Sequence, residues 1–364
     1  MRRSCGHVQS KHEKDGFFRT GILTQGHIHQ YNKNTKDQHC FMYRTKDGRR
    51  LGKKDTVTKE YMQDPVIFAD AFNKYLYHGR QVIKPERLKG LDTTEITVPY
   101  GSGGAGVPEQ RYRDVLKTMM TDGDMAYCIL GIENQSGIHY AMPVKNGLYD
   151  LMQLAHQVTE TARSHKRERK EDADGHDISS DEYLSGFYKT DKLLPVVTLV
   201  IFYSAEKWDG PLTLREMYPF VDDALMQYVP DYRVNLIAPG DISEEEIQEF
   251  RSSLREVMLY IKYSKDKKRL REVVQKDENF HNLERQAAEV INVTTDSRLK
   301  YPEGQEVVNV CTAIEEIKIE GRIEGSVETY REVGFSLEDT IQRVAEKYGL
   351  SLQRAEEEVR RYWK

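Results

Sequence analysis

A carboxylate and an amide close an otherwise apolar run in the segment "CILGIENQ". Its apolar residues are typical of a buried strand, and Glu133 and Gln135, two residues apart, lie on one face of such a strand. A second acid, Asp114, precedes the apolar segment "VLKTMM". Two carboxylates that face one pocket offer the oxygen ligands that a hard divalent cation prefers. The pattern therefore predicts a Mg²⁺ or Mn²⁺ site at which a phosphorus centre is polarised and water is activated.

The alternative is a structural one. The chain contains 59 acidic residues, so that two acids near neighbouring strands occur by chance, and a rim of carboxylates could simply pair with Arg111 or Arg113. Chemistry alone therefore leaves both interpretations open.

The spacing of the two acids depends on a hairpin between them. The dipeptide "DG" at 122–123 separates two apolar runs, which is a strong hairpin signal. A two-residue loop there places Asp114 opposite Gly131 and one diagonal step from Glu133 on the same face. A three-residue loop would reverse the parity and separate the acids. The prediction of a shared site thus depends on the turn type.

Other segments predict the elements around this hairpin. A capping Asp64 before Pro65 starts a helix with an apolar stripe, and Asp70 lies off that stripe. Residues 140–163 follow a helical period, and "LLPVVTLVIFYS" at 193–204 is typical of a central strand. The predicted apolar stripe of the 140–163 helix consists of Leu148, Leu151, Met152, Ala155 and Val158.

Composition favours one α/β core with an appended helical part. The 364 residues are 38% hydrophobic and 31% charged, with a net charge of −5. No apolar run reaches the roughly 18 residues of a membrane span, and no signal sequence is recognisable, which predicts a cytoplasmic protein. The four cysteines are far apart and are expected to be free thiols. Basic residues gather in residues 1–60 and in 262–271, and either group could meet phosphates.

The predicted organisation has three parts. Residues 1–55 are an extension without a packed core, residues 56–240 form the α/β core, and residues 241–364 are helical. Exposed insertions are expected near 101–110 and 163–182. The tail predicts two capped helices, which could form a DNA-reading helix-turn-helix, although packing or homodimer formation through these helices is favoured.

Several blocks together resemble one family: "DPVIFADAFNKYLY", "RYRDVL", "LGIENQSGIHYAMPVKNGLYD", "LLPVVTLVIFYSAEKWDGPLTLREM", "VPDYRVNLIAP" and "YIKYSKDKKRL". From about residue 53 to the end, the chain looks like the Rpn family of recombination-promoting, transposase-like nucleases, which have the PD-(D/E)XK fold. The resemblance implies a mixed sheet flanked by helices, DNA as partner, and Mg²⁺- or Mn²⁺-dependent endonuclease activity.

The resemblance also assigns roles. Asp114 matches the motif aspartate and Glu133 the motif glutamate, both as metal ligands, while Gln135 stands where many relatives have lysine. An acid on the first helix often completes such sites, and Asp70 is the expected one, with Asp64 as the alternative. The runner-up function is a nuclease-fold module that binds DNA or self-associates without efficient catalysis.

The first 50 residues have no counterpart in the family. The segment "LGKKDTVTKEYM" looks like a family N-terminus with Leu51 in place of a starting Met. We therefore expect residues 1–50 to result from an upstream start assignment.

Overall fold

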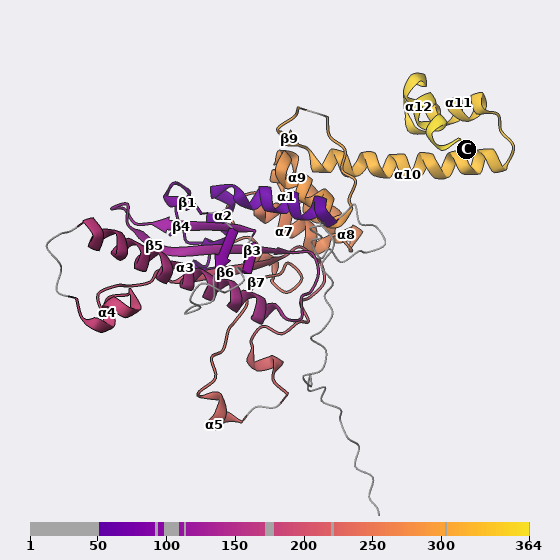
Figure 1. Cartoon of the computed structure of the whole chain (residues 1–364). Helices are drawn as coiled ribbons and strands as arrows, with labels where there is room; N and C mark the ends of the chain where they lie inside the picture. The colour runs from indigo at the N-terminus through magenta and orange to yellow at the C-terminus, as the bar shows by residue number, and fades with distance from the viewer. Residues whose placement is uncertain are drawn as a thin grey trace, which may run out of the picture. The chain divides into compact units, whose positions relative to one another are not determined.

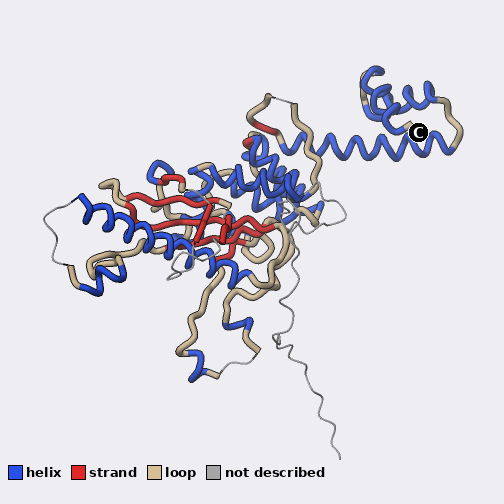
Figure 2. Tube along the Cα trace, viewed as in Figure 1, coloured by secondary structure: helices blue, strands red, loops and turns tan. Residues whose placement is uncertain are grey.

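A five-stranded mixed sheet forms the centre of the computed structural model, which describes residues 51–91, 94–97, 109–112, 114–171, 178–219, 222–302 and 304–363 (Figures 1 and 2). The strand order is β1-β4-β5-β6-β7. β5 pairs antiparallel with β4 and parallel with β6, and β7 continues the parallel part. The bounds are β1 Leu88–Gly90, β4 Val115–Met120, β5 Ala126–Gln135, β6 Val196–Phe202 and β7 Asn235–Ile237. The predicted α/β architecture with a mixed sheet is confirmed.

Four short strands form two further ribbons. β2 (Thr94–Thr97) pairs with β3 (Glu109–Tyr112), and β8 (Leu283–Glu284) pairs with β9 (Val307–Val308), both antiparallel. The "GSGGAG" segment and residues 1–50, including the extension and start expected there, lie outside the described residues.

The β4–β5 hairpin has a different loop and register from the predicted ones. Thr121 and Met125 close a three-residue loop, in which Asp124 takes a φ of 58°. A register shift between Met119 and Met120 then adds a second offset of one residue. Two offsets of one residue restore the parity of side chains, because successive residues of a strand face opposite sides.

Helices cover both faces of the sheet (Figure 1). One face, with Leu130 and Ile132 of β5, shares a core with α1 (Leu51–Gln63), α2 (Pro65–Tyr77), α7 (Leu254–Tyr263) and α9 (Arg285–Thr295). On the other face α3 (Met142–Glu171) packs against β6, and Met142 joins Val200 in a smaller cluster. Burial of these apolar side chains is the main force that holds the helices on the sheet.

Two helix predictions need correction. α1 begins at Leu51, so that its first residues, up to Asp55, fall in the range predicted as the extension, and the predicted helix at Asp64-Pro65 is the second one, α2. α3 is longer than expected, and its buried face is rotated: Tyr149 and Met152 are buried, whereas Leu151 is 47% exposed. Much of the predicted 163–182 insertion is the continuation of α3.

The remaining helices lie mainly in the C-terminal half of the chain. The described ones are α4 Ser180–Ser185, α5 Asp223–Met226, α6 Glu244–Ile247, α8 Lys267–Lys276, α10 Val310–Glu332, α11 Leu337–Tyr348 and α12 Leu352–Tyr362, with short 3₁₀ turns at Pro85–Arg87, Arg215–Met217 and Glu278–His281. None of the helices in the described residues is long and apolar enough to cross a membrane.

α10 joins two separate hydrophobic clusters. Its first turn, with Val310, belongs to the main core, whereas Ile323 and Val327 pack with α11 and α12. The side chains of Ser336 and Ser351 cap α11 and α12, as the sequence predicted. The tail is therefore a small helical unit with a core of its own.

Candidate active site

The hairpin register brings the two predicted acids together. Val115 pairs with Ile132, so the register continued by one residue places Asp114 opposite Glu133 rather than opposite Gly131. The Asn134 N–H donates to Asp114 Oδ2 over 2.7 Å, which fixes this carboxylate beside the end of β5. Directly opposed residues of antiparallel strands lie closer than diagonal ones. The two acids thus lie on adjacent chain segments, one residue beyond the Val115–Ile132 pair.

Glu133 is almost inaccessible and paired with a lysine. The residue is 3% exposed, and Lys145 Nζ of α3 is 2.9 Å from Glu133 Oε2. Burial lowers the pKa of Lys145, but the Glu133 carboxylate and the nearby Tyr149 and Asp114 outweigh that effect and raise it. Lys145 therefore carries its positive charge at the acid pair, 5.7 Å from the ring centre of Tyr149.

Desolvation makes the negative charge on Asp114 costly. Burial raises the pKa of this carboxyl, and the Asn134 N–H, Lys145 and Lys59 oppose the shift only in part. A carboxylate in such surroundings gains from a further cation close by.

α1 contributes two more charged groups. Asp55 and Lys59 are four residues apart and so lie on one side of the helix. Desolvation, and then the charge of Asp114, raise the pKa of Asp55, while Lys145 lowers it. Asp55 is therefore a first-helix acid whose charge acts on the pair.

Tyr203 adds a hydroxyl from the end of β6. The residue is 3% exposed, and its hydroxyl has no hydrogen-bond partner within the described residues. Burial, and then the negative charge of Asp114, raise its pKa far above the ordinary value. The group is thus a neutral donor near the acid pair.

Gln135 occupies the predicted position on the same face of β5 as Glu133. It is half-buried, and its carbonyl oxygen accepts the Tyr203 N–H over 2.8 Å. This bond holds the ends of β5 and β6 together.

The two expected first-helix acids have structural contacts elsewhere. Asp70 is 3% exposed and accepts hydrogen bonds from the backbone N–H groups of Arg251 and Ser252 and from the Ser252 hydroxyl, at 2.6–2.9 Å. Asp64 caps α2 through Val66 N at 2.7 Å. These contacts give both acids structural roles, whereas Asp55 of α1 is an acid of the first helix whose charge interacts with that of Asp114.

Sequence reasoning missed Asp55, Lys145 and Tyr203. A signal existed for Lys145, which lies one helical turn before Tyr149 in the segment after the strand. Asp55 was missed because the first residues of α1 fall in the range predicted as extension. Tyr203 was hidden because its closeness to Asp114 arises only from the sheet order.

The donor set fits a cation held by few protein ligands. No group of three or more His, Cys, Asp or Glu side chains in the described ranges could hold a metal ion. Mg²⁺ commonly uses one or two carboxylates, with water and substrate phosphate as the other ligands. Asp114, whose charge is costly without a cation, and the facing Glu133 match that pattern. The predicted alternative, pairing with Arg111 or Arg113, concerns side chains outside the described residues.

Comparisons with protein-family models, with curated proteins and with solved structures give no match to this chain. The resemblance to the Rpn nucleases therefore stays a prediction, and a functional proposal has to rest on the geometry around Asp114 and Glu133.

Proposed function

We propose that this protein is a divalent-metal-dependent DNA endonuclease with a PD-(D/E)XK core of the Rpn type. The observation that carries the proposal is the facing of Asp114 and Glu133 across β4 and β5, with the Lys145 ammonium beside them. A hairpin that ends in two acids and joins a parallel pair through β5 and β6 supports this fold type, as do the flanking α1 and α3.

Asp114 and Glu133 would hold the Mg²⁺ or Mn²⁺. When bound, the ion supplies Lewis-acid polarisation of the scissile phosphodiester and a lower pKa for the attacking water. Glu133 would exchange its contact with Lys145 for this cation. Asp114 is kept in place during the exchange by its bond to Asn134 N.

Lys145 would supply the positive charge that a lysine supplies in nucleases that have Lys at the position of Gln135. With Glu133 as a metal ligand, the Lys145 ammonium would stay next to the site and would donate to a phosphate oxygen, on which negative charge grows in the transition state. Gln135 would orient water or phosphate through its amide. The Tyr203 hydroxyl, which has no partner within the described residues, would donate to a ligand at Asp114.

Several basic side chains of the segment 262–271 already have partners within the protein, so only some of its members are proposed to contact DNA. Arg269 is paired with Glu244, Arg271 with Glu315 and Lys265 with Glu206. Lys262 donates to the carbonyl oxygens of Pro239 and Ile242. The exposed Lys267 and Lys268 at the start of α8 are the members that we propose to meet the phosphate backbone.

The test is nicking of supercoiled plasmid by purified protein in Mg²⁺ or Mn²⁺. We expect Asp114→Asn and Glu133→Gln each to remove nicking, whereas Asp124→Asn, at the exposed loop of the same hairpin, keeps it. Nicking that persists in both site variants, or that is absent from the wild-type protein with either metal ion, would contradict the proposal.

A second function is favoured by one contact. The 2.9 Å ion pair between Lys145 and Glu133 satisfies a buried carboxylate without a metal ion. If that pair is structural, the protein is a nuclease-fold module that binds DNA or self-associates. DNA binding without cleavage, unchanged by Asp114→Asn, would support this function over the first.

A further inference from the structure

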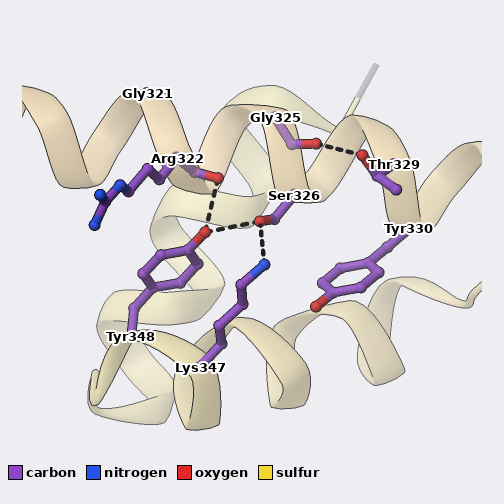
Figure 3. A pocket seen from close by; sticks show the side chains of 8 residues that line it. All are labelled: Gly321, Arg322, Gly325, Ser326, Thr329, Tyr330, Lys347 and Tyr348. Carbon is purple, nitrogen blue, oxygen red and sulfur yellow. Dashed lines mark hydrogen bonds between the residues drawn. The ribbon is translucent and has the colours of Figure 1, made fainter.

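The C-terminal half of α10 has one packed side. Ile323 and Val327 lie in the small core with α11 and α12. On the adjoining flank, Ser326 Oγ accepts from Lys347 Nζ over 3.1 Å and lies 2.7 Å from the Tyr348 hydroxyl. Figure 3 shows Ser326 and these two α11 side chains directed toward one another. This side of the helix is occupied by its own chain.

Gly321 and Gly325 lie on the adjoining, open side of the same turns, where they form the rim of the groove that Ser326, Lys347 and Tyr348 also line. Gly321 and Gly325 are exposed, and a Cβ added to either would meet nothing within 4 Å. At 100° per residue, the two glycines lie on the side opposite Ile323, together with Glu328 and Glu332. Without side chains at these positions, the backbone of a second helix could come unusually close.

The charges along this open side have an order. Lys318 and Arg322 precede Gly325, and Glu328 and Glu332 follow it. Among the described residues, no ion pair involves Arg322, Glu328 or Glu332, and Lys318 contacts Glu315 at 3.4 Å, with 36% of its side chain exposed. The face is therefore basic on one side of the glycine and acidic on the other.

This order of charges lets two copies of α10 pair in the antiparallel direction, because the basic part of each copy then faces the acidic part of the other. When two copies of α10 cross antiparallel at Gly325, residues at equal steps before and after the glycine meet. Lys318, about 20° from Gly325 around the helix, then lies beside Glu332 of the second copy, whereas Arg322 and Glu328, each about 60° from Gly325, lie at the same level on opposite flanks of the crossing. The second copy's Thr329, a small residue, meets Gly321. A parallel crossing would place like charges together, which is unfavourable.

We propose that the protein forms a two-fold symmetric dimer through antiparallel contact of α10 with α10 of a second copy, centred on Gly325. The same patch serves both copies, as two-fold symmetry requires. One helix pair buries less than the roughly 1,200 Å² of a small specific interface, so the dimer is weak, with a dissociation constant on the order of micromolar. It does not depend on the proposed nuclease activity.

The test is sedimentation velocity of the full chain from about 1 to 100 µM, a range chosen around the expected micromolar dissociation constant. The wild-type protein is expected to shift from monomer to dimer, and Gly325→Leu to stay monomeric throughout. Because a Cβ added at Gly325 meets nothing within 4 Å, and leucine favours helix over glycine, this variant is expected to keep the fold, which circular dichroism verifies.

A charge swap makes the test specific for the antiparallel direction. Lys318→Glu is expected to weaken the dimer at least tenfold, and the double variant Lys318→Glu with Glu332→Arg to restore it. Glu346→Arg, an exposed charge reversal on α11, serves as the control and should dimerise like the wild type. A monomeric wild type at the highest concentration, or a Gly325→Leu protein that dimerises normally, would overturn the proposal.

Discussion

Lys145 of α3 and Glu133 of β5 form a 2.9 Å ion pair in which the carboxylate side chain is 4% exposed and that of the lysine 26%. The pair joins the helix on one face of the sheet to the end of the strand with the candidate motif. It therefore has two possible roles, to stabilise the fold and to place a positive charge at the acid pair, and substitutions can separate them.

Lys145→Met should lower both stability and activity. Removing one partner of a buried ion pair leaves the other charge uncompensated, which costs about 3 kcal/mol. The nicking rate should fall about 100-fold, as for loss of one transition-state donor. Lys145→Arg should keep most of the stability and part of the rate. Urea unfolding and single-turnover nicking measure the two effects, and Lys166→Met on the exposed surface of the same helix is the control. An unchanged rate in folded Lys145→Met would remove this lysine from the mechanism.

Asp114→Asn should stabilise the metal-free protein as it inactivates it. The pKa of Asp114 is raised in the folded state, mainly by burial. The stability that its protonated form provides is complete below the ordinary pKa and is lost as pH rises through the raised one. The asparagine variant does not lose this stability, so the amount by which its unfolding free energy exceeds that of the wild type should grow from pH 4 toward pH 7.

The measurement is urea unfolding of both proteins in EDTA across that pH range. Asp124→Asn, whose side chain is at the exposed hairpin loop, should show no such trend. Equal stabilities of Asp114→Asn and wild type at every pH would contradict the burial argument.

Tyr203→Phe should weaken metal binding without harming the metal-free fold. Its buried hydroxyl has no partner within the described residues, so removal should cost nothing and could gain up to about 1 kcal/mol. If the hydroxyl donates to a ligand at Asp114, the rise in melting temperature caused by Mn²⁺ should shrink. Tyr61→Phe is the matched control, because its hydroxyl lies 2.9 Å from Ser253 Oγ, and its loss should cost about 1 kcal/mol with the Mn²⁺ response unchanged.

Asp70→Ala should lower stability, whereas Asp55→Asn should lower the response to Mn²⁺. The first leaves the N–H groups of Arg251 and Ser252 unpaired and should cost about 3 kcal/mol of unfolding free energy. Asp55 is exposed, so its replacement should leave stability within about 0.5 kcal/mol but reduce the Mn²⁺ response. Thermal unfolding with and without Mn²⁺ separates the two. A normal Mn²⁺ response in Asp55→Asn would exclude this acid from the site.

The sequence predicted elements better than their relation in space. The central strand and the capped helices at Ser336 and Ser351 followed from local patterns. The predicted relation of Asp114 and Glu133 depended on a two-residue loop, whereas the hairpin has a three-residue loop and a bulge. The bulge, the lysine on α3 and the tyrosine after β6 did not follow from local patterns, because they depend on contacts between distant segments. Asp70 was misleading, since a buried acid that binds backbone N–H groups looks in sequence like a catalytic one.

The loop and the bulge of the β4–β5 hairpin act as two compensating one-residue insertions, about 20 Å from the acids, at 3.4 Å per strand residue. Deleting a single residue in this loop would turn Asp114 and Glu133 to opposite sides of the sheet, although neither acid is touched. Removing two would slide them along the same side. The candidate site therefore depends on whether the number of residues between the two acids is kept odd or even, and we expect homologous hairpins to differ in length by even numbers of residues.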